Sequence, residues 1–262
     1  MKYIQSELSR ELRSKYSALT NDNSTGLDVA FQNMRIRAIR KNAEIDSFRI
    51  EHPELRVPFS VPRNHKRKMI KNGVKNLENA FKWGRSNFDS SNFNEEFIRE
   101  LAGKITPELY EGRIAQYRTT GTQITGSSVT PPYPSKFREI EIPKFVNCMR
   151  SKLQSEDVID RIESAIFAHM HIARMHPFID GNGRTARTLQ YILLDNMRIP
   201  PPIIEVGERN TYYSLLDGAV YDWKHEREQG TKKGVSHGEQ LFYDFIAGKI
   251  NISLDKVICH RC

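Results

Sequence analysis

The stretch His176-Pro-Phe-Ile-Asp-Gly-Asn-Gly-Arg-Thr-Ala-Arg187 decides the fold, because it joins two apolar helical patterns through a short polar loop. Before the loop, apolar residues recur at spacings of three and four between positions 158 and 173, and the same spacing returns between positions 186 and 193. Pro177 cannot continue the first helix, and Gly181-Asn-Gly183 supplies a backbone that bends tightly. We therefore expect two buried helices joined by a short loop.

The second half of this stretch has the features of an anion site. The N–H groups of Gly181, Asn182 and Gly183 lie at the start of the second helix, where the helix dipole also favours negative charge. Arg184 and Arg187 are three positions apart, so they share one face of that helix and can grip phosphate oxygens. These residues predict a cradle for phosphate groups.

Asp180 and His176 add a candidate metal ligand and a candidate base. Mg²⁺ is usually held by few carboxylates together with substrate phosphates, which fits Asp180. The imidazole of His176 titrates near neutral pH, as a general base requires. His169 and His171 precede it, but a spacing of two in a helix splays the side chains, so we expect His169 to hydrogen-bond in the core and not to bind zinc. The combined residues indicate chemistry on a nucleotide phosphate.

The composition is that of a cytoplasmic protein with a core of ordinary size. The chain has 262 residues, 38% of them hydrophobic, and a mean hydropathy of −0.59. No apolar run approaches the roughly 18 residues of a membrane span, and the charged start argues against a signal peptide. Three cysteines argue against a disulfide framework. Cys259 and Cys262 have a C-x-x-C spacing without a second ligand pair, so we expect a frayed tail there.

The net charge of +8 suits an anionic substrate or partner. The densest basic cluster, residues 63–75, lacks the interleaved aromatic residues of a base-stacking surface. We therefore interpret it as a solvated loop that leads into a helix, and nucleic acid is not the expected partner.

The chain predicts a mainly α protein with one small β element. Further helices are expected over residues 4–19, 27–51, 72–88, 93–105, 142–153, 211–221 and 241–250. Proline-rich links are expected near residues 53–62 and 196–205, and a basic, glycine-containing loop over residues 224–238. Residues 117–134 are rich in Thr, Val and Gly with polar alternation, which predicts a hairpin or an extended loop.

At residues 176–187 the sequence resembles the signature of the Fic family, H-P-F-x-[DE]-G-N-G-R-x-x-R, and every fixed position matches. Tyr117-Arg118, the Thr/Gly-rich stretch after it and Pro131-Pro132 resemble the flap of that family. The resemblance covers about residues 72–250. It implies the Fic fold, a helical bundle with a small β-hairpin flap before the motif. It also implies a catalytic domain over residues 72–262, preceded by an N-terminal helical region over residues 1–71.

The resemblance implies a protein adenylyltransferase that moves AMP from ATP to a Ser, Thr or Tyr hydroxyl of a target protein, or of the chain itself. In such an enzyme His176 takes the proton of the hydroxyl, and Asp180 holds Mg²⁺ on the phosphates. The phosphates would be bound by Gly181, Asn182, Gly183, Arg184 and Arg187. The target segment would add as a strand to the flap at Gly121, Thr122, Gln123, Ile124 and Thr125. An adenine pocket would be lined by Tyr212 and Tyr213.

Many members of the family also carry an inhibitory helix with the pattern [ST]-x-x-x-E-[GN]. Ser47-Phe-Arg-Ile-Glu51 resembles it, within a helix expected over about residues 28–51. His52 departs from the pattern, because Gly or Asn there would end the helix cleanly. The resemblance implies that Glu51 pairs with Arg187 and blocks the productive position of the γ-phosphate.

Two other functions stay open at this point. A hydrolase on the same scaffold would remove AMP from a modified protein, with Glu51 orienting the attacking water. A non-enzymatic adaptor would bind nucleotide or nucleic acid through its basic surface, although the intact His176 and Asp180 count against it. Neither the target protein nor the preferred base is encoded in the motif.

Overall fold

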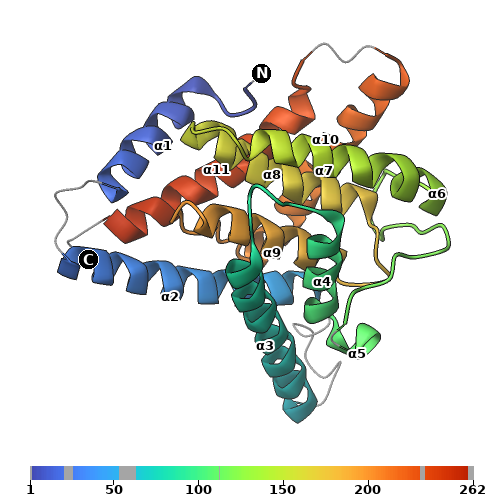
Figure 1. The fold of residues 1–262 in the computed structure, drawn as a ribbon, viewed down its shortest axis with the longest axis horizontal. Helices are drawn as coiled ribbons and strands as arrows, with labels where there is room; N and C mark the ends of the chain where they lie inside the picture. The colour runs from blue at the N-terminus through green and yellow to red at the C-terminus, as the bar shows by residue number, and fades with distance from the viewer. Residues whose placement is uncertain (1, 21–25, 53–62, 112, 231–233, 259–262) are drawn as a thin grey trace.

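The structure is a computed structural model that describes residues 2–20, 26–52, 63–111, 113–230 and 234–258 (Figure 1). The described residues form helices joined by irregular segments, and no named strand occurs among them. The helices are α1 (Ser6–Leu19), α2 (Gly26–Glu51), α3 (Arg63–Asn87), α4 (Glu95–Ile105), α5 (Pro107–Tyr110), α6 (Pro134–Lys136), η2 (Phe137–Glu141), α7 (Ile142–Lys152), α8 (Val158–Met175), α9 (Asn182–Asp195), η3 (Val206–Glu208), α10 (Arg209–Glu228) and α11 (His237–Ile258).

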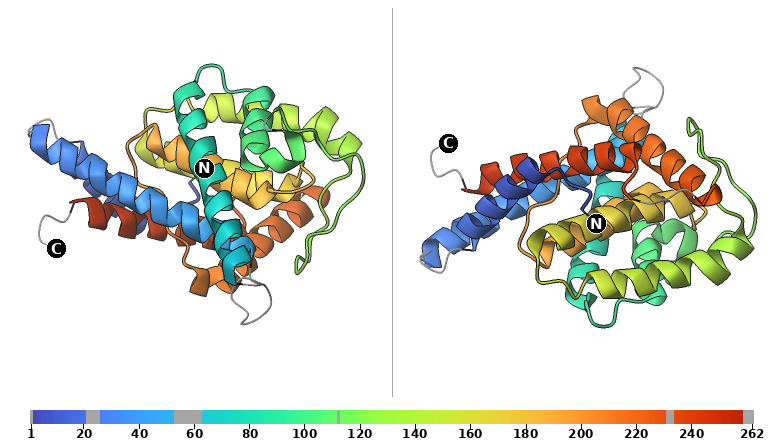
Figure 2. Two further views of the ribbon diagram at one scale, coloured as in Figure 1. Left: turned by 90° about the horizontal axis from the view of Figure 1, so that it is seen from below. Right: turned by 90° about the horizontal axis from the view of Figure 1, so that it is seen from above.

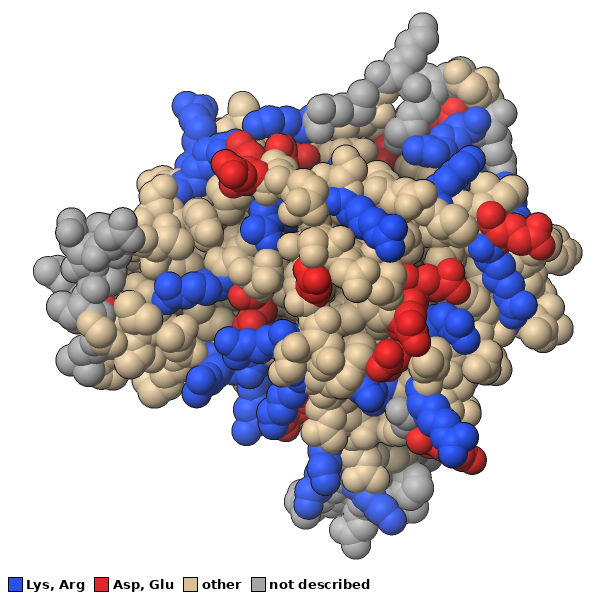
Figure 3. Space-filling model, in the orientation of Figure 1, with Lys and Arg blue, Asp and Glu red and all other residues tan. Residues whose placement is uncertain are grey.

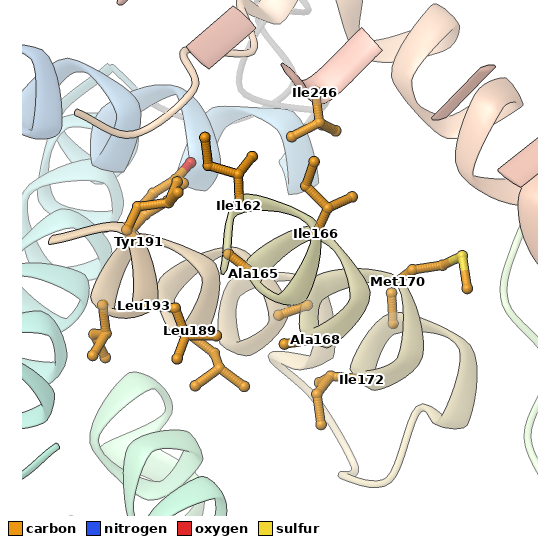
Figure 4. Packing of buried hydrophobic residues seen from close by; sticks show 14 of the residues in the cluster. Ile162, Ala165, Ile166, Ala168, Met170, Ile172, Leu189, Tyr191, Leu193 and Ile246 are labelled. Carbon is orange, nitrogen blue, oxygen red and sulfur yellow. The ribbon is translucent and has the colours of Figure 1, made fainter. Parts of the chain in front are cut away.

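Helices α8 and α9 form the centre of the molecule (Figure 4). Ala165 and Ala168 of α8 and Leu189 of α9 are fully buried. The small alanines let the two helices approach closely, and Ile162 and Ile166 turn toward Ile246 of α11 (Figure 4). Because α8 is covered on nearly all sides, the loop that follows it is held by a rigid element.

The remaining helices surround this pair (Figures 1 and 2). Helix α1 packs against α11, and α2 crosses both α9 and α11. Helices α3 and α4 pack together and against α9. The start of the chain is tied to α8, since Glu163 accepts hydrogen bonds from the backbone N–H groups of Tyr3 at 2.7 Å and Ile4 at 2.9 Å. One hydrophobic cluster therefore extends from Ile4 to Val257.

The predicted helices are present, and several are longer than expected. Helix α3 begins at Arg63, so the basic cluster over residues 63–75 is helical and not a loop. Helical structure begins at Pro134, eight residues before the expected start at Ile142. Helix α10 continues to Glu228, into the predicted basic loop. Among the described residues, no helix is both long enough and apolar enough to cross a membrane.

The prediction of a β-hairpin flap is wrong. Residues 113–133 form an extended arm along one end of the molecule (Figures 1 and 2). Within the described chain the only β-type pairing of this arm is an isolated antiparallel bridge between Tyr117 and Phe178. Polar alternation indicates an extended backbone, but it does not determine the partner of that backbone. Here the partner is the motif loop, so the two halves of the arm do not form a ladder.

Candidate functional site

The motif loop begins where α8 ends, at His176. Pro177 disfavours a right-handed helical conformation at the preceding residue, and His176 adopts the left-handed conformation with φ 47° and ψ 54°. Its backbone carbonyl accepts a hydrogen bond from Arg118 Nε at 2.8 Å, and the Arg118 N–H donates to the Pro177 carbonyl at 2.9 Å. The imidazole is thus carried on a backbone that is held from both sides.

Asn182 closes the loop from within. Its side-chain oxygen accepts the Phe178 N–H at 2.8 Å, and its amide donates to the Phe178 carbonyl at 2.9 Å. Phe178 is buried and anchors the loop in the core. Gly181 has φ 77°, and a Cβ there would lie 2.8 Å from the Thr106 side chain. The glycine therefore permits both the tight turn and the close approach to the end of α4.

The start of α9 is an anion site that a protein carboxylate fills. One oxygen of Glu51 accepts from Arg187 at 2.6 Å, and the other accepts from Arg184 Nε at 3.0 Å. A Cβ on Gly183 would lie 2.2 Å from Oε1 of Glu51, so only glycine admits the carboxylate here. Charge-assisted pairs of this kind are short and strong, and the helix dipole adds to them. The end of α2 therefore lies directly on the predicted phosphate cradle.

Arg187 is fully buried, and its partners fix it in place. Its Nε donates to Ser47 Oγ at 2.8 Å and a terminal nitrogen donates to the Ser47 carbonyl at 3.1 Å. Another terminal nitrogen lies 3.3 Å from the Tyr212 hydroxyl. That hydroxyl lies 2.7 Å from Nε2 of His169, whose Nδ1 faces the Gln190 side-chain oxygen at 2.9 Å.

The predicted core role of His169 agrees with this chain of contacts. Burial, with the charge of Arg187, lowers the pKa of His169 to about 3, so the ring is neutral at physiological pH. Nδ1 then donates to Gln190, and Nε2 accepts from Tyr212. In this structure Tyr212 is fully buried and supports Arg187, whereas Tyr213 is half-buried beside Arg209. The assignment of both tyrosines to an adenine pocket stays a prediction.

The last turn of α2 is held without the Gly or Asn of the family pattern. The Ile50 carbonyl accepts from Arg209 Nε of α10 at 2.8 Å, which satisfies one carbonyl at the helix end. The His52 ring packs on Phe48 with 4.3 Å between ring centroids. Phe48 in turn packs against Gly73 of α3. His52 therefore has a packing role at the position where the pattern departs.

His176 and Asp180 lie at the open side of the loop. Burial lowers the pKa of His176, partly offset by the nearby Glu51 carboxylate, so the ring is neutral at pH 7 and can accept a proton. The Asp180 side chain is 60% exposed and accepts from Arg184 at 2.8 Å. No group of three or more potential metal ligands among His, Cys, Asp and Glu occurs in the described chain. The predicted Cys259–Cys262 spacing lies outside the described residues.

The arm before the motif is fixed at both ends and open between them. Arg118 donates to the carbonyls of Thr120 at 2.7 Å and Pro132 at 2.6 Å, besides that of His176. Asp217 of α10 accepts from the Ser128 N–H at 3.1 Å and its hydroxyl at 2.5 Å. Between these ties, the predicted docking residues 121–125 are half-buried or exposed. The sequence placed Arg118 in the stretch that resembles the flap, but no pattern predicts this role, because its partners are backbone carbonyls from separate segments.

The comparisons with known proteins agree with this geometry. A family model described as the Fic/DOC family matches residues 92–194, which include the arm, α8, the loop and most of α9. Over these residues the chain is similar to a Fic domain. Similar solved structures include a Fic-domain-containing signaling protein from Bacteroides thetaiotaomicron, with a TM-score of 0.63, 19% identity and coverage of 96% of this chain and 95% of the other. Fic-1 from Caenorhabditis elegans has a TM-score of 0.63 and 20% identity, covering 96% of this chain and 71% of the other.

Curated proteins similar to this chain are named protein adenylyltransferases. A protein adenylyltransferase Fic from Nematostella vectensis is 32% identical over 152 residues, which cover 56% of this chain and 34% of the relative. A protein adenylyltransferase fic-1 from C. elegans is 36% identical over 121 residues, covering 46% of this chain and 22% of the relative. The match spans about a third or less of the length of these relatives.

Proposed function

We propose that this chain is a protein adenylyltransferase that moves AMP from ATP to a Ser, Thr or Tyr hydroxyl, and that Glu51 holds it inactive. The observation that carries the proposal is the Glu51 carboxylate bound to Arg184 and Arg187 at the start of α9. A carboxylate bound by two guanidinium groups and a helix N-terminus occupies a site whose chemistry suits a phosphate. The curated relatives are named protein adenylyltransferases, which supports AMP as the transferred group.

The reaction needs one base and several donors. The hydroxyl oxygen of the target attacks the α-phosphorus of ATP while its proton passes to the neutral His176 ring. The bond between the α-phosphorus and its bridging oxygen breaks, and pyrophosphate leaves. Such transfer depends mainly on positioning and charge neutralisation. The N–H groups of Gly181, Asn182 and Gly183 and the two arginines supply the donors once Glu51 withdraws.

The residues of the loop also fit the Mg²⁺ that this reaction would use. Asp180 is a single, exposed carboxylate at the rim of the cradle. Mg²⁺ prefers one or two carboxylates with water and phosphate oxygens, so a site with one protein ligand suits it. When bound, the ion would neutralise charge on the phosphates. Asp180 would exchange its contact with Arg184 for this role.

Inhibition follows from competition for the same guanidinium groups. With Glu51 on Arg187, the outer phosphates lose a donor and meet a negative charge instead. Ser47 strengthens the block, because it holds Arg187 from the same helix one turn earlier. The target segment would dock along residues 121–125, which lie in the open part of the arm and would take an added strand.

The direct test is transfer of label from ATP labelled at the α-phosphate, with Mg²⁺ present. We expect Glu51→Gly to label the chain itself, or a lysate protein, at least about tenfold more than wild type, since a tenfold change needs only ~1.4 kcal/mol. The control is Glu78→Gly, which removes an exposed helical glutamate of α3. Equal labelling by wild type and Glu51→Gly would contradict inhibition. His176→Ala in the Glu51→Gly background should abolish labelling, and surviving transfer would remove His176 as the base.

Removal of AMP from a modified protein distinguishes the hydrolase alternative from the transferase. The Glu51 carboxylate lies on Arg184 and Arg187, at the start of the helix that follows the loop of His176. Protein that has been modified by the Glu51→Gly variant is offered to wild type, and release of AMP is measured. We expect no release above the His176→Ala background. Release by wild type would favour the hydrolase. ATP binding without labelling in either direction would favour the adaptor.

A further inference from the structure

A cavity of about 710 Å³ lies outside the motif, between the arm, α7, α8 and α10. It is lined by residues 129–133 of the arm but by no residue of the motif loop. Its volume is that of a site for a small ligand or for one or two side chains of a peptide. Neither the reaction nor its inhibition by Glu51 uses this space.

The inner wall of the cavity is a row of aromatic rings. Phe145 and Phe167 lie nearly parallel with 6.0 Å between centroids. The His171 ring lies 4.1 Å from Phe167 and 5.1 Å from the ring of Trp223. Phe167 and Trp223 are only half-buried, so their rings are accessible to an apolar or aromatic side chain.

The rim of the cavity is strongly cationic. Among the described residues that line it, the cations are Lys136, Lys144, Lys152, Arg174, Lys224 and Arg227. Glu141 is the one carboxylate in the lining, and it is paired with Arg174 at 2.7 Å. Arg174 and Arg227 lie over Trp223, at 3.9 and 4.4 Å from the ring centroid. An anion that enters therefore meets an excess of positive charge.

The cavity is linked to the reaction site through the arm. Arg118 donates to the Pro132 carbonyl at the cavity and to the His176 carbonyl at the loop. Arg174 belongs to the last turn of α8, two residues before His176. The arm continues from residues 121–125 to the cavity lining at residues 129–133 through a turn, in which the Ser127 N–H donates to the Ile124 carbonyl at 3.0 Å.

We propose that this cavity binds an acidic peptide segment that carries an aromatic or large aliphatic side chain. The apolar side chain lies on Phe167 and Trp223, and the flanking carboxylates meet the lysines of the rim. The assignment of this segment to the modified protein rests on the proposed function, with the hydroxyl docked on the arm and the acidic segment in the cavity. Binding of the segment itself requires neither ATP nor transfer.

The test uses the full chain with Trp83→Phe, so that Trp223 is the remaining tryptophan. The probe is an acetylated, amidated peptide Glu-Glu-Asp-Phe-Glu-Glu, titrated without nucleotide while tryptophan fluorescence is followed. We expect a saturable change that weakens at least fivefold between 50 and 200 mM salt. Matched peptides with Gln and Asn for the acids, or with Ser for the Phe, should bind at least tenfold more weakly.

Charge reversal locates the site. Lys144→Glu with Lys152→Glu should weaken the acidic peptide at least tenfold, whereas Lys75→Glu with Lys82→Glu on α3 should not, although the net charge changes equally. Equal affinity for the acidic and neutral peptides, or no saturable change in wild type up to millimolar peptide, would overturn the proposal without any variant. Equal weakening by both double variants would overturn the location. None of these outcomes depends on labelling by ATP, so failure here leaves the proposed transferase activity standing.

Discussion

At the scale of single residues, Ser47 and Glu51 both accept hydrogen bonds from Arg187. Glu51 supplies charge to both motif arginines, and Ser47 supplies a hydroxyl and a backbone carbonyl to one. Under the proposed inhibition, losing the carboxylate removes the block itself. Losing the hydroxyl removes one neutral acceptor of a charged donor and leaves the block in place but weaker.

Ser47→Ala should therefore give labelling between that of wild type and that of Glu51→Gly. The lost hydrogen bond from a charged donor is worth roughly 1.5–3 kcal/mol at most, part of which the Ser47 carbonyl retains. Initial rates of label transfer measure the effect, with Ser14→Ala in the exposed part of α1 as control. A Ser47→Ala protein that is as inactive as wild type would show that the hydroxyl does not contribute to inhibition.

His176 leads to a prediction about pH. Burial lowers its pKa below the usual value of about 6.5, so the neutral base is present at pH 7 and is lost as the pH falls through the lowered pKa. The transfer rate of Glu51→Gly should therefore be flat from about pH 7 to 8 and fall only below ~6.5. Because the Glu51 carboxylate raises this pKa in wild type, residual wild-type activity should decline at a higher pH. A variant profile that declines already above pH 7 would contradict the lowered pKa.

At the scale of elements, the crossing of α2 and α3 determines how firmly Glu51 is presented. Gly73 of α3 faces the Phe48 ring, and a Cβ at that position would lie 1.9 Å from a ring carbon. Phe48 is one position after Ser47 and is itself buried. We expect a displacement of the ring to shift the end of α2, which carries Ser47 and Glu51.

Gly73→Ala should lower the free energy of unfolding and raise basal labelling together. Overpacking typically costs about 1–3 kcal/mol, against a gain in helix propensity of up to ~1 kcal/mol. The matched control is Gly248→Ala in α11, where a Cβ would meet nothing within 4 Å. That change should stabilise by roughly 0.5–1 kcal/mol and leave labelling unchanged. Thermal unfolding and label transfer are measured on the same samples. A Gly73→Ala protein that is less stable than wild type but labels no better would contradict this coupling.

At the scale of the whole molecule, the N-terminal helices belong to the same packed body as the motif. Helix α1 packs on α11 and α8, and α2 packs on α9, within one hydrophobic cluster. Helix α3 continues through the expected boundary at residue 71. We infer that residues 1–71 and 72–262 differ in function and not in folding. Residues 1–71 supply the proposed inhibition, and residues 72–262 supply the chemistry. Figure 3 shows Lys and Arg side chains gathered over α2 and α3 on one face, and mixed with acidic residues elsewhere.

Calorimetry should therefore record a single cooperative transition for the whole chain, in which the calorimetric and van't Hoff enthalpies agree. Glu51→Gly should shift that transition as a whole, since the ion pairs it removes connect α2 to α9. The direction is toward lower temperature, because two buried guanidinium groups each lose one carboxylate acceptor. A separate first transition that accounts for the N-terminal helices alone would show that they form an independent unit.

The sequence by itself determined the helices, the loop and the chemical character of the cradle. The spacing of apolar residues and the backbone effects of proline and glycine depend on a few neighbouring residues. The helix pair around residues 176–187 could therefore be predicted from local sequence. The sequence predicted an extended segment over residues 117–134, but it could not predict the partner of that segment, because the pairing of an extended backbone depends on what lies beside it. Tyr117 pairs with Phe178 and not with its own return arm.

The tertiary structure alone decided which groups share a site. Ser47 and Glu51 lie more than 130 positions before the arginines they contact. The family resemblance implied that Glu51 pairs with Arg187, but the period and composition of the chain carry no information about that approach. Arg118 joins three backbone carbonyls, and Tyr212 supports Arg187 from the core. The cationic cavity likewise combines residues of the arm with α7, α8 and α10. Burial and charge complementarity between distant segments bring these groups together, and both exist only in the packed chain.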